Sequence, residues 1–415
     1  MLRGGAREAL CAEVDGLVPG RAVAPSTPAE VAATLLAARE AGEAVIPWGG
    51  GTHQATGGLP ARYDVALDMR GLDAVRAHTP QDLTVTVEAG VTLARLQQVL
   101  AGHGQHLPIE VEAPERATIG GLIGSGVAGP SRLGRGTLRD LLLWTEVATP
   151  EGRLVRGGAQ VVKSVAGYDT PKLHIGALGS LGVVTAACFR LMPRPVARRL
   201  VRVAVETPAA VGLALAAPMA AGLQPCLMTV SRGPAAWGGA YRPDGYVVSC
   251  GFEGAAPAVD AAADRLTAAL RGLAVTPAVL ANVGCEMAVD ALMAPRGWGS
   301  LRVRCLTASD RVPTLLDDLA ALPDPPTAIW AEAGNGVVRA AWGEVPDAPD
   351  AWWQALRRVI GPPGGTWVVE AAPPAWKRCG LEVWGPERPD WALMRGLKRA
   401  WDPAGVLAPG RTPGG

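Results

Sequence analysis

Histidine is scarce in this sequence, and none occurs after residue 174. The chain has five histidines, and all of them lie between His53 and His174, so residues 175–415 contain none. Histidine is the side chain most often used as a general base near neutral pH and as a metal ligand. Its absence therefore excludes a histidine base or a histidine-ligated metal site from the second half of the chain.

Cysteine is sparse and shows no metal-binding pattern. The seven cysteines are scattered along the chain and form no C-x-x-C pair. This usage excludes a cysteine ligand set for zinc or an iron–sulfur cluster, and it is typical of reduced thiols in the cytoplasm. We therefore predict no metal site. If the protein transfers electrons, they must leave through a partner.

The chain also lacks an excess of charge and a long apolar segment. Its formal net charge is +1 over 415 residues, which argues against a nucleic-acid or polybasic membrane surface. The longest uncharged run, 207–231, contains three prolines and is too weakly apolar for a membrane span. With no secretory signal evident, we expect a cytoplasmic protein of two domains, attached to the inner membrane, if at all, through partners.

Glycine is abundant instead, and it is concentrated in the stretch 117–189. Residues 124–129 fit G-x-G-x-x-G, but Pro130 follows at once, so the helix that a Rossmann dinucleotide site needs cannot start there. We therefore expect an extended, glycine-rich ribbon whose backbone amides face a cofactor. Glycine-rich hairpin turns in an ordinary sheet are the alternative.

A second glycine cluster follows the first helix–strand pair. The pattern predicts a helix over 28–43 and a strand over 44–48, which leads into Gly49-Gly50-Gly51-Thr52-His53. A strand followed by glycines and a hydroxyl residue is typical of an anion cradle, although the lysine of a nucleotide P-loop is missing. In this loop we expect the His53 amide, rather than its imidazole, to be the ligand donor.

Further elements indicate an α+β fold. Residues 64–69 and 84–89 alternate as strands, and 91–103 predict a helix with Thr92 as its cap. The densest polar cluster lies in 161–175, and it is either a solvated loop or one wall of a buried site. Its polar members are Lys163, Ser164, Tyr168, Asp169, Lys172 and His174.

Several strings in these segments resemble the FAD-binding domain of the vanillyl-alcohol oxidase and p-cresol methylhydroxylase superfamily. They look most like the FAD-binding subunits of bacterial glycolate oxidase (glycolate dehydrogenase). The strings are GGGT at 49–52, ATIGG at 117–121, GVAGPSRLGRGTLRD at 126–140, VKSVAGYDTPKL at 162–173, GSLGVVT at 179–185, LMPRP at 191–195 and LMRGLKRAWDPAGVLAPGR at 393–411. The region from about 200 to 385 matches only loosely.

The resemblance implies an FAD-binding domain of two α+β lobes at 1–195. It also implies an α+β cap domain with an antiparallel sheet at 196–385, which binds substrate or a partner. A segment at 386–415 would return to the FAD domain. Some relatives hold FAD covalently through a histidine in the first loop, but the aligned residue here is Thr52. We therefore expect non-covalent FAD.

Motif correspondence also implies which residues face the cofactor. The first loop would meet the pyrophosphate, the second segment the ribityl chain and ring, and the third the flavin or adenine end. The implied cofactor-binding residues are Gly49, Gly50, Gly51, Thr52, His53, Thr118, Gly120, Gly121, Ser125, Gly126, Gly179, Gly182 and Val183.

The function implied is that of an FAD-dependent oxidoreductase acting on CH–OH donors. The leading hypothesis is the FAD-binding subunit of a glycolate oxidase type complex. That subunit would oxidise a small 2-hydroxy acid beside a related FAD subunit and an iron–sulfur subunit, which accepts the electrons. The alternatives are a self-sufficient D-2-hydroxy-acid (lactate-like) dehydrogenase and a catalytically silent flavin-binding scaffold. The catalytic base stays unassigned among Tyr168, His53, His174 and carboxylates such as Glu332.

Tryptophan is concentrated in the second half of the chain. Of thirteen tryptophans, only Trp48 and Trp144 precede residue 237. With only two phenylalanines and four tyrosines in the chain, the favoured interpretation is that tryptophan fills the core of the second domain. The alternative is that Trp352, Trp353 and Trp376 form a docking surface.

Overall fold

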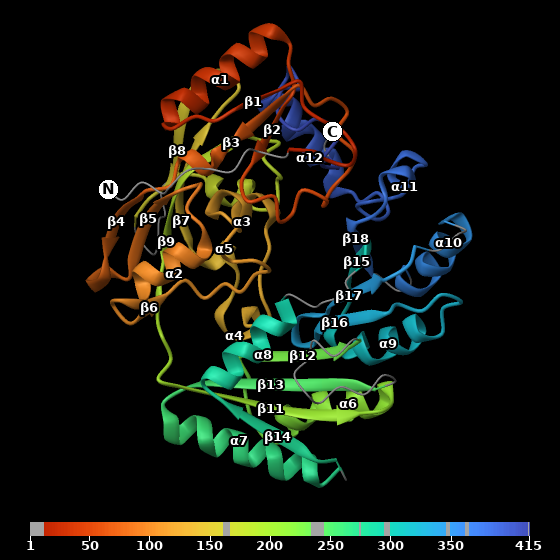
Figure 1. The fold of residues 1–415 in the computed structure, drawn as a ribbon. Helices are drawn as coiled ribbons and strands as arrows, with labels where there is room; N and C mark the ends of the chain where they lie inside the picture. The colour runs from red at the N-terminus through yellow and green to blue at the C-terminus, as the bar shows by residue number, and fades with distance from the viewer. Residues whose placement is uncertain are drawn as a thin grey trace. The chain divides into compact units, whose positions relative to one another are not determined.

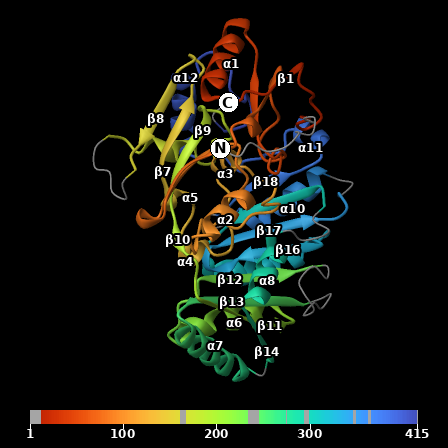
Figure 2. The same ribbon diagram turned by 60° about the vertical axis from the view of Figure 1, so that its left-hand side comes forward.

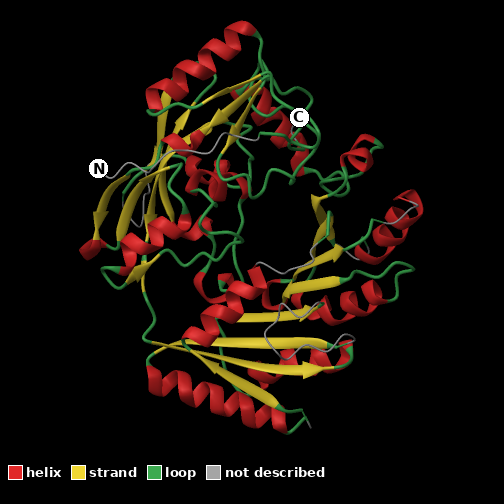
Figure 3. Cartoon of the chain, in the orientation of Figure 1, coloured by secondary structure: helices red, strands yellow, loops and turns green. Residues whose placement is uncertain are grey.

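The chain forms two compact units, which Figure 1 shows as a ribbon. Unit 1 comprises Met1–Ala128, Thr137–Arg194 and Pro386–Gly415, and unit 2 comprises Gly129–Gly136 and Pro195–Gly385. The computed structural model describes residues 12–160, 167–233, 245–273, 275–293, 299–345, 349–361, 365–413 and 415. Each unit is built on its own sheets, coloured yellow in Figure 3.

The first lobe of unit 1 is a three-stranded parallel sheet with strand order β1-β3-β2. Its strands are β1 (Arg21–Val23), β2 (Val45–Trp48) and β3 (Val65–Asp68). Helix α1 (Pro28–Ala41) packs with this sheet in one core through Val31 and Leu35. The Thr27 side chain caps its N-terminus and left-handed Gly42 ends it, so the predicted helix is confirmed.

The second lobe of unit 1 is a five-stranded antiparallel sheet with order β4-β5-β9-β7-β8. Its strands are β4 (Val75–Thr79), β5 (Thr84–Glu88), β7 (Leu142–Ala148), β8 (Leu154–Gly158) and β9 (Val183–Arg190). Helix α2 (Leu93–Ala101) packs Leu93, Leu96 and Leu100 into the core of this lobe. The Thr92 side chain accepts a bond from the Arg95 amide, which confirms the predicted cap.

The glycine-rich stretch of unit 1 departs from the predicted extended ribbon. It contains the helices α3 (Ile119–Ser125) and α5 (Leu138–Leu141). Thr118 caps α3, and Ile119, Leu122 and Ile123 are buried in the lobe core. Tertiary burial of these side chains outweighs the low helix propensity of three glycines, so a ribbon inferred from glycine content was wrong here.

Unit 2 is organised around an eight-stranded antiparallel sheet with order β14-β11-β13-β12-β16-β17-β15-β18, which can be followed upward by its labels in Figure 1 and, except for β15, in Figure 2. Its strands are β11 (Ala197–Val205), β12 (Leu227–Arg232), β13 (Tyr246–Gly254), β14 (Pro277–Ala281), β15 (Leu301–Leu306), β16 (Ala328–Glu332), β17 (Val337–Trp342) and β18 (Thr366–Ala371). Together with unit 1 this sheet confirms the predicted α+β fold with an antiparallel sheet in its second half.

Four helices share one hydrophobic core with alternate residues of the unit 2 sheet, and so cover one of its faces. They are α6 (Pro208–Ala220), α7 (Ala256–Arg271), α9 (Val312–Ala320) and α10 (Pro349–Ile360). Helix α8 (Val283–Met293) packs through Cys285 in a separate cluster with Leu200 and Leu227, which point to the opposite face. That second face carries most of the buried charges of the unit.

Several of the described tryptophans of unit 2 belong to its core. Trp352 is buried, its ring lies 4.9 Å from that of Trp342, and it also contacts the rings of Trp353 and Trp376. Trp353 and Trp376 are partly buried against the same core. The contacts favour core filling over a docking surface for these residues.

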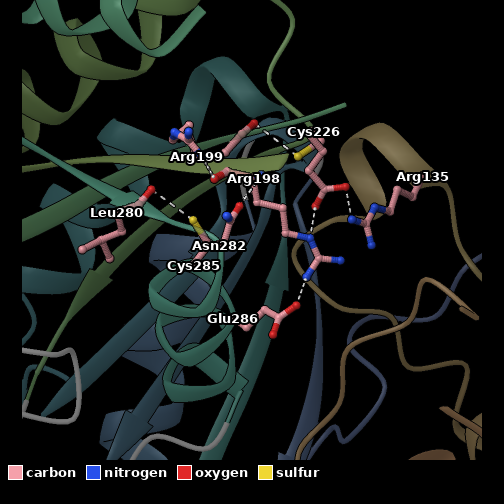
Figure 4. A network of polar contacts seen from close by, with 10 residues as sticks. Arg135, Arg198, Arg199, Cys226, Leu280, Asn282, Cys285 and Glu286 are labelled. Carbon is pink, nitrogen blue, oxygen red and sulfur yellow. Dashed lines mark hydrogen bonds and ion pairs between the residues drawn. The ribbon is translucent and has the colours of Figure 1, made fainter. Parts of the chain in front are cut away.

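Residues 129–136 fall inside the range 1–195 assigned from sequence to the FAD domain, yet they pack with unit 2. They include the one-turn helix α4 (Arg132–Arg135), and the Gly134 amide donates to the Cys226 carbonyl. Arg135 pairs with Glu253, which also faces Arg198, and Arg198 pairs with Glu286 of α8 (Figure 4). This network holds the segment against the sheet.

Shorter elements complete the two units. Unit 1 contains the β6 (Gln105–His106) and β10 (Met192–Pro193) pair and the C-terminal helix α12 (Asp390–Trp401), and unit 2 contains α11 (Pro374–Arg378). Single 3-10 turns occur at η1 (Met69–Gly71), η2 (Pro80–Asp82), η3 (Thr170–His174), η5 (Ser309–Arg311) and η6 (Ala333–Asn335). No helix in the described ranges has both the length and the apolar composition needed to cross a bilayer.

Candidate cofactor site

A pocket in unit 1 brings the two glycine-rich segments together. Strand β2 and its loop form one side, α3 forms another, and the turn before β9 forms a third. The lining residues are Pro47, Trp48, Gly49, Gly50, Gly51, Thr52, His53, Gln54, Met69, Ala89, Thr118, Gly120, Gly121, Gly124, Ser125, His174, Leu178, Gly179, Gly182, Val183, Val184 and Arg411.

The first loop lies directly against the start of α3. A Cβ on Gly49 would come within 2.2 Å of Thr118 Oγ1, and one on Gly50 within 1.8 Å of the Arg116 carbonyl oxygen. Arg116 Nη2 donates to the Gly50 carbonyl at 3.0 Å, which fixes the same contact. Only glycine allows this approach, so these two positions have a packing requirement.

The amides of this loop are available to a ligand. Those of Gly50, Gly51 and Thr52 donate no hydrogen bond to any residue in the described ranges. Gly51 has a φ of +73°, which turns the loop over the Trp48 ring. Consecutive outward amides in such a turn form an anion-binding concavity. The chemistry of this donor set fits the pyrophosphate of a dinucleotide.

The turn that precedes β9 is shaped by two glycines with left-handed backbone. Gly179 has a φ of +74°, and a Cβ there would lie 2.4 Å from Pro47 Cγ. Gly182 has a φ of +158°, and a Cβ there would lie 2.4 Å from Val147 Cγ1. The absence of side chains at both positions lets this turn of the pocket wall pack closely against Pro47 and Val147.

The C-terminal segment braces the first loop through a buried cation. Arg411 is 2% exposed, and its guanidinium donates to the carbonyls of Gln54, Thr56 and Gly58. It also forms an ion pair with Asp15 at 3.3 Å. Sequence reasoning missed this residue, because nothing local to position 411 shows which loop it reaches.

A second buried cation braces the turn before β9. Lys398 of α12 donates to the carbonyls of Ser180 and Leu407 and pairs with Asp402. The Asp402 carboxylate in turn accepts from the amides of Val406 and Leu407. The C-terminal segment thus supports two sides of the pocket, although only Arg411 lines it.

The predicted cofactor residues mostly meet in this pocket. All of them line it except Gly126, which instead packs against Gly176. Thr52 Oγ1 lies 2.9 Å from Nδ1 of His53. The contact of each residue with FAD stays a prediction.

Only some of the candidate proton acceptors line the pocket. His53 and His174 line the pocket, whereas Tyr168 is 93% exposed and does not. Lys163 and Ser164 lie outside the described residues. Burial lowers the pKa of His174 to about 4, which makes it a weak proton acceptor at neutral pH.

Glu332 lies in unit 2, within a buried cluster of charges on the second face of the sheet. Its carboxylate pairs with Arg339 at 2.8 Å and with Arg132 at 3.6 Å. Arg339 also pairs with Glu370, which faces Arg304. Burial raises the pKa of Glu332, and the nearby guanidiniums oppose this effect. Across the described parts of both units, no group of histidine, cysteine and carboxylate side chains could hold a metal ion.

Comparison with known proteins agrees with this geometry. Residues 19–158 match the family model described as FAD binding domain. The fold and the pocket thus define an FAD-binding protein, and FAD is its cofactor. Over part of its length the chain is also similar to glycolate oxidase subunits and D-lactate dehydrogenases.

Curated relatives match over part of their length. The chain is 38% identical over 130 residues to the glycolate oxidase subunit GlcE of Escherichia coli, covering 31% of this chain and 37% of that protein. It is 30% identical over 178 residues to the glycolate oxidase subunit GlcD of Bacillus subtilis, covering 43% and 38%. It is 32% identical over 178 residues to the mitochondrial D-lactate dehydrogenase [cytochrome] of Arabidopsis thaliana, covering 43% and 31%. The matches thus span less than half of each of these relatives.

Solved structures extend the likeness in fold to nearly the whole chain. A structure of alkyldihydroxyacetonephosphate synthase superimposes with a TM-score of 0.69, covering 94% of this chain and 75% of that one. The sequence identity is 18%, so this match shows the fold alone.

Proposed function

We propose that this chain is the FAD-binding subunit of a glycolate oxidase type assembly that oxidises a small 2-hydroxy acid. The observation that carries the proposal is the unit 1 pocket, in which both glycine-rich segments converge. The similarity to the glycolate oxidase subunits GlcE and GlcD supports the choice of substrate class and assembly. The assembly would lie in the cytoplasm, or at the inner membrane through its partners.

In this reaction the substrate carbon loses a hydride and its hydroxyl group loses a proton. FAD, when bound, supplies the hydride acceptor. The two electrons then pass to an iron–sulfur partner, because the cysteines of this chain show no cluster-binding pattern. Within the chain, the amides of the Gly49–Thr52 loop hold the cofactor phosphates, and Arg411 holds that loop in shape.

The proton acceptor is unassigned, and the site narrows the choice. The low pKa of the His174 imidazole argues against it, and the exposed Tyr168 lies outside the pocket lining. His53 is left as the candidate in the pocket lining, and Glu332 is left as the buried carboxylate candidate in unit 2. The Glu332 carboxylate is held by two arginines, and its Oε2 accepts no hydrogen bond among the described residues.

The similarity to D-lactate dehydrogenases supports a second candidate, a self-sufficient FAD-linked dehydrogenase. Two measurements separate these functions from a silent scaffold. First, the purified chain is precipitated with acid and the absorbance spectra of supernatant and pellet are recorded. We expect FAD in the supernatant, because Thr52 replaces the histidine through which some relatives bind flavin. Flavin in the pellet would disprove non-covalent binding.

The second measurement is dye reduction with glycolate and with D-lactate. We expect slow reduction by the purified chain alone and fast reduction after it is combined with a related FAD subunit and an iron–sulfur subunit. Fast reduction by the chain alone would replace the subunit proposal with the self-sufficient dehydrogenase. Bound FAD without reduction in either preparation would leave the scaffold.

A further inference from the structure

His174 stands out among the residues of the cofactor pocket. It ends the 3-10 turn η3, is 6% exposed, and lines the pocket beside the turn before β9. A Cβ on Gly182 would lie 3.4 Å from its Cε1 atom. On another side, its ring lies 5.8 Å from that of Trp401 in α12. The imidazole is therefore held in one place by two parts of unit 1.

The His174 imidazole lacks the partner that its burial calls for. Its Nδ1 atom is buried and has no hydrogen bond with any of the residues the structure describes. Buried polar atoms in folded proteins are nearly always paired, and an exception calls for an explanation. The ring lines the pocket, so a rotation of the imidazole would bring a nitrogen to a ligand bound there and give it such a partner.

The protonation state of His174 defines what that ligand must offer. Burial lowers the pKa of His174 to about 4, so the ring is neutral at pH 7. A neutral imidazole carries one N–H donor and one nitrogen acceptor. The ligand therefore needs a carbonyl, hydroxyl, amine or phosphate group at the pocket wall, and FAD carries all of these.

We propose that His174 is a cofactor-binding residue whose imidazole hydrogen-bonds a polar group of FAD in the unit 1 pocket. This proposal rests on FAD binding by unit 1 and is independent of the substrate and of the electron acceptor. It assigns His174 a binding role rather than the role of general base.

The test compares FAD binding by the full-length chain and two variants. Deflavinated wild type, His174→Phe and His103→Phe are titrated with FAD, and the quenching of flavin fluorescence is followed. Phenylalanine keeps the aromatic packing on Trp401 but removes both nitrogens. We expect His174→Phe to weaken FAD binding about three- to tenfold, as the loss of one hydrogen bond does. The exposed His103 is not in the pocket lining, so its variant should bind FAD as the wild type does.

A second readout follows FAD binding in the wild-type chain and needs only His174→Asn for assignment, so it stands even if His174→Phe fails to fold. With 15N-labelled histidine, the chain has five imidazoles to follow by NMR. We expect the His174 ring resonances, identified by their loss in His174→Asn, to shift when FAD is added. Unchanged resonances, or FAD affinity of His174→Phe equal to that of the wild type, would overturn the proposal. Failure to oxidise 2-hydroxy acids would bear on the proposed function only.

Discussion

The two units place their polar chemistry in opposite ways. The unit 1 pocket presents main-chain amides and glycines, and its buried cations, Arg411 and Lys398, satisfy carbonyls of the surrounding turns. The second face of the unit 2 sheet instead carries charged side chains, with Glu332 and Arg339 almost fully buried. An added side-chain atom is therefore expected to disrupt the unit 1 pocket, whereas the loss of a charged partner is expected to disrupt the unit 2 cluster.

The largest effect is expected from a single added methyl group in the first loop. In Gly50→Ala the new Cβ would overlap the Arg116 carbonyl oxygen, so the loop must move away from α3. We expect loss of bound FAD and a fall in unfolding free energy of about 4 kcal/mol, near the upper end for point mutations. Flavin absorbance of the purified protein and urea unfolding measure the two effects.

The matched control is Gly396→Ala in α12. A Cβ at that position meets nothing within 4 Å, and the backbone is helical. It should keep its FAD and gain up to about 1 kcal/mol from better helix propensity. Normal FAD content in Gly50→Ala would show that the contact between the loop and α3 is not required.

The next largest effect is expected at Arg411, the buried cation that holds the loop of the unit 1 pocket. Arg411→Gln leaves Asp15 and three loop carbonyls without their guanidinium partner. Removal of one member of a buried ion pair costs about 3–5 kcal/mol. We expect a fall of about 3 kcal/mol in unfolding free energy, together with at least tenfold weaker FAD binding. The exposed Arg399→Gln on α12 is the control, and equal behaviour of the two variants would contradict the role of Arg411.

In unit 2 the corresponding change is Glu332→Gln, which removes a charge without changing size. Arg339 keeps Glu370 as a partner, so we expect a moderate loss of about 2 kcal/mol. Because Glu332 belongs to unit 2, FAD content should not change. The control is Glu387→Gln, since Glu387 is 68% exposed and its pair with Arg395 should contribute under about 1 kcal/mol.

Glu332→Gln also tests whether Glu332 is the proton acceptor. If Glu332 takes the substrate proton, Glu332→Gln lowers kcat of the assembled enzyme far more than it changes KM, even though FAD stays bound. If Glu332 has only a structural role, Glu332→Gln lowers the unfolding free energy but leaves kcat of the folded enzyme close to that of the wild type. Equal losses of unfolding free energy in Glu332→Gln and Glu387→Gln would show that the buried cluster does not depend on the charge of Glu332.

The sequence predicts those features whose cause lies nearby in the chain. The glycine segments at 49–51 and 117–121 could be recognised locally, because a close backbone approach restricts the residue type at each position. The helix predicted over 28–43 from its proline, its glycine and its apolar spacing is observed over 28–41. The fold class, the FAD-binding domain and FAD as cofactor were predicted correctly from these strings.

Other features could not be predicted, because their cause is distant in the chain. Arg411 acts on carbonyls more than 350 residues away. Glu332 finds its partners on β17 and in the segment 129–136. The same segment packs with unit 2 although its neighbours on both sides belong to unit 1. The helix α3 replaced the predicted ribbon, because burial of its isoleucines and leucine decides the conformation and glycine content does not.

A pH dependence of stability is expected from one residue of the unit 1 pocket, His174. The ordinary pKa of histidine, 6.5, falls to about 4 for His174 in the folded protein. Between these values the unfolded chain binds the proton more tightly, so the stabilising contribution is complete above pH 6.5 and is lost as the pH falls toward 4. Full loss corresponds to at most about 3 kcal/mol.

In urea unfolding of the deflavinated protein at pH 7 and pH 4.5, the wild type should lose about 2 kcal/mol more than His174→Phe. His103→Phe should follow the wild type at both pH values. Equal losses in the wild type and His174→Phe would mean that the imidazole is already hydrated in the apo pocket, and that the unit 1 site is less dry than its buried Nδ1 indicates.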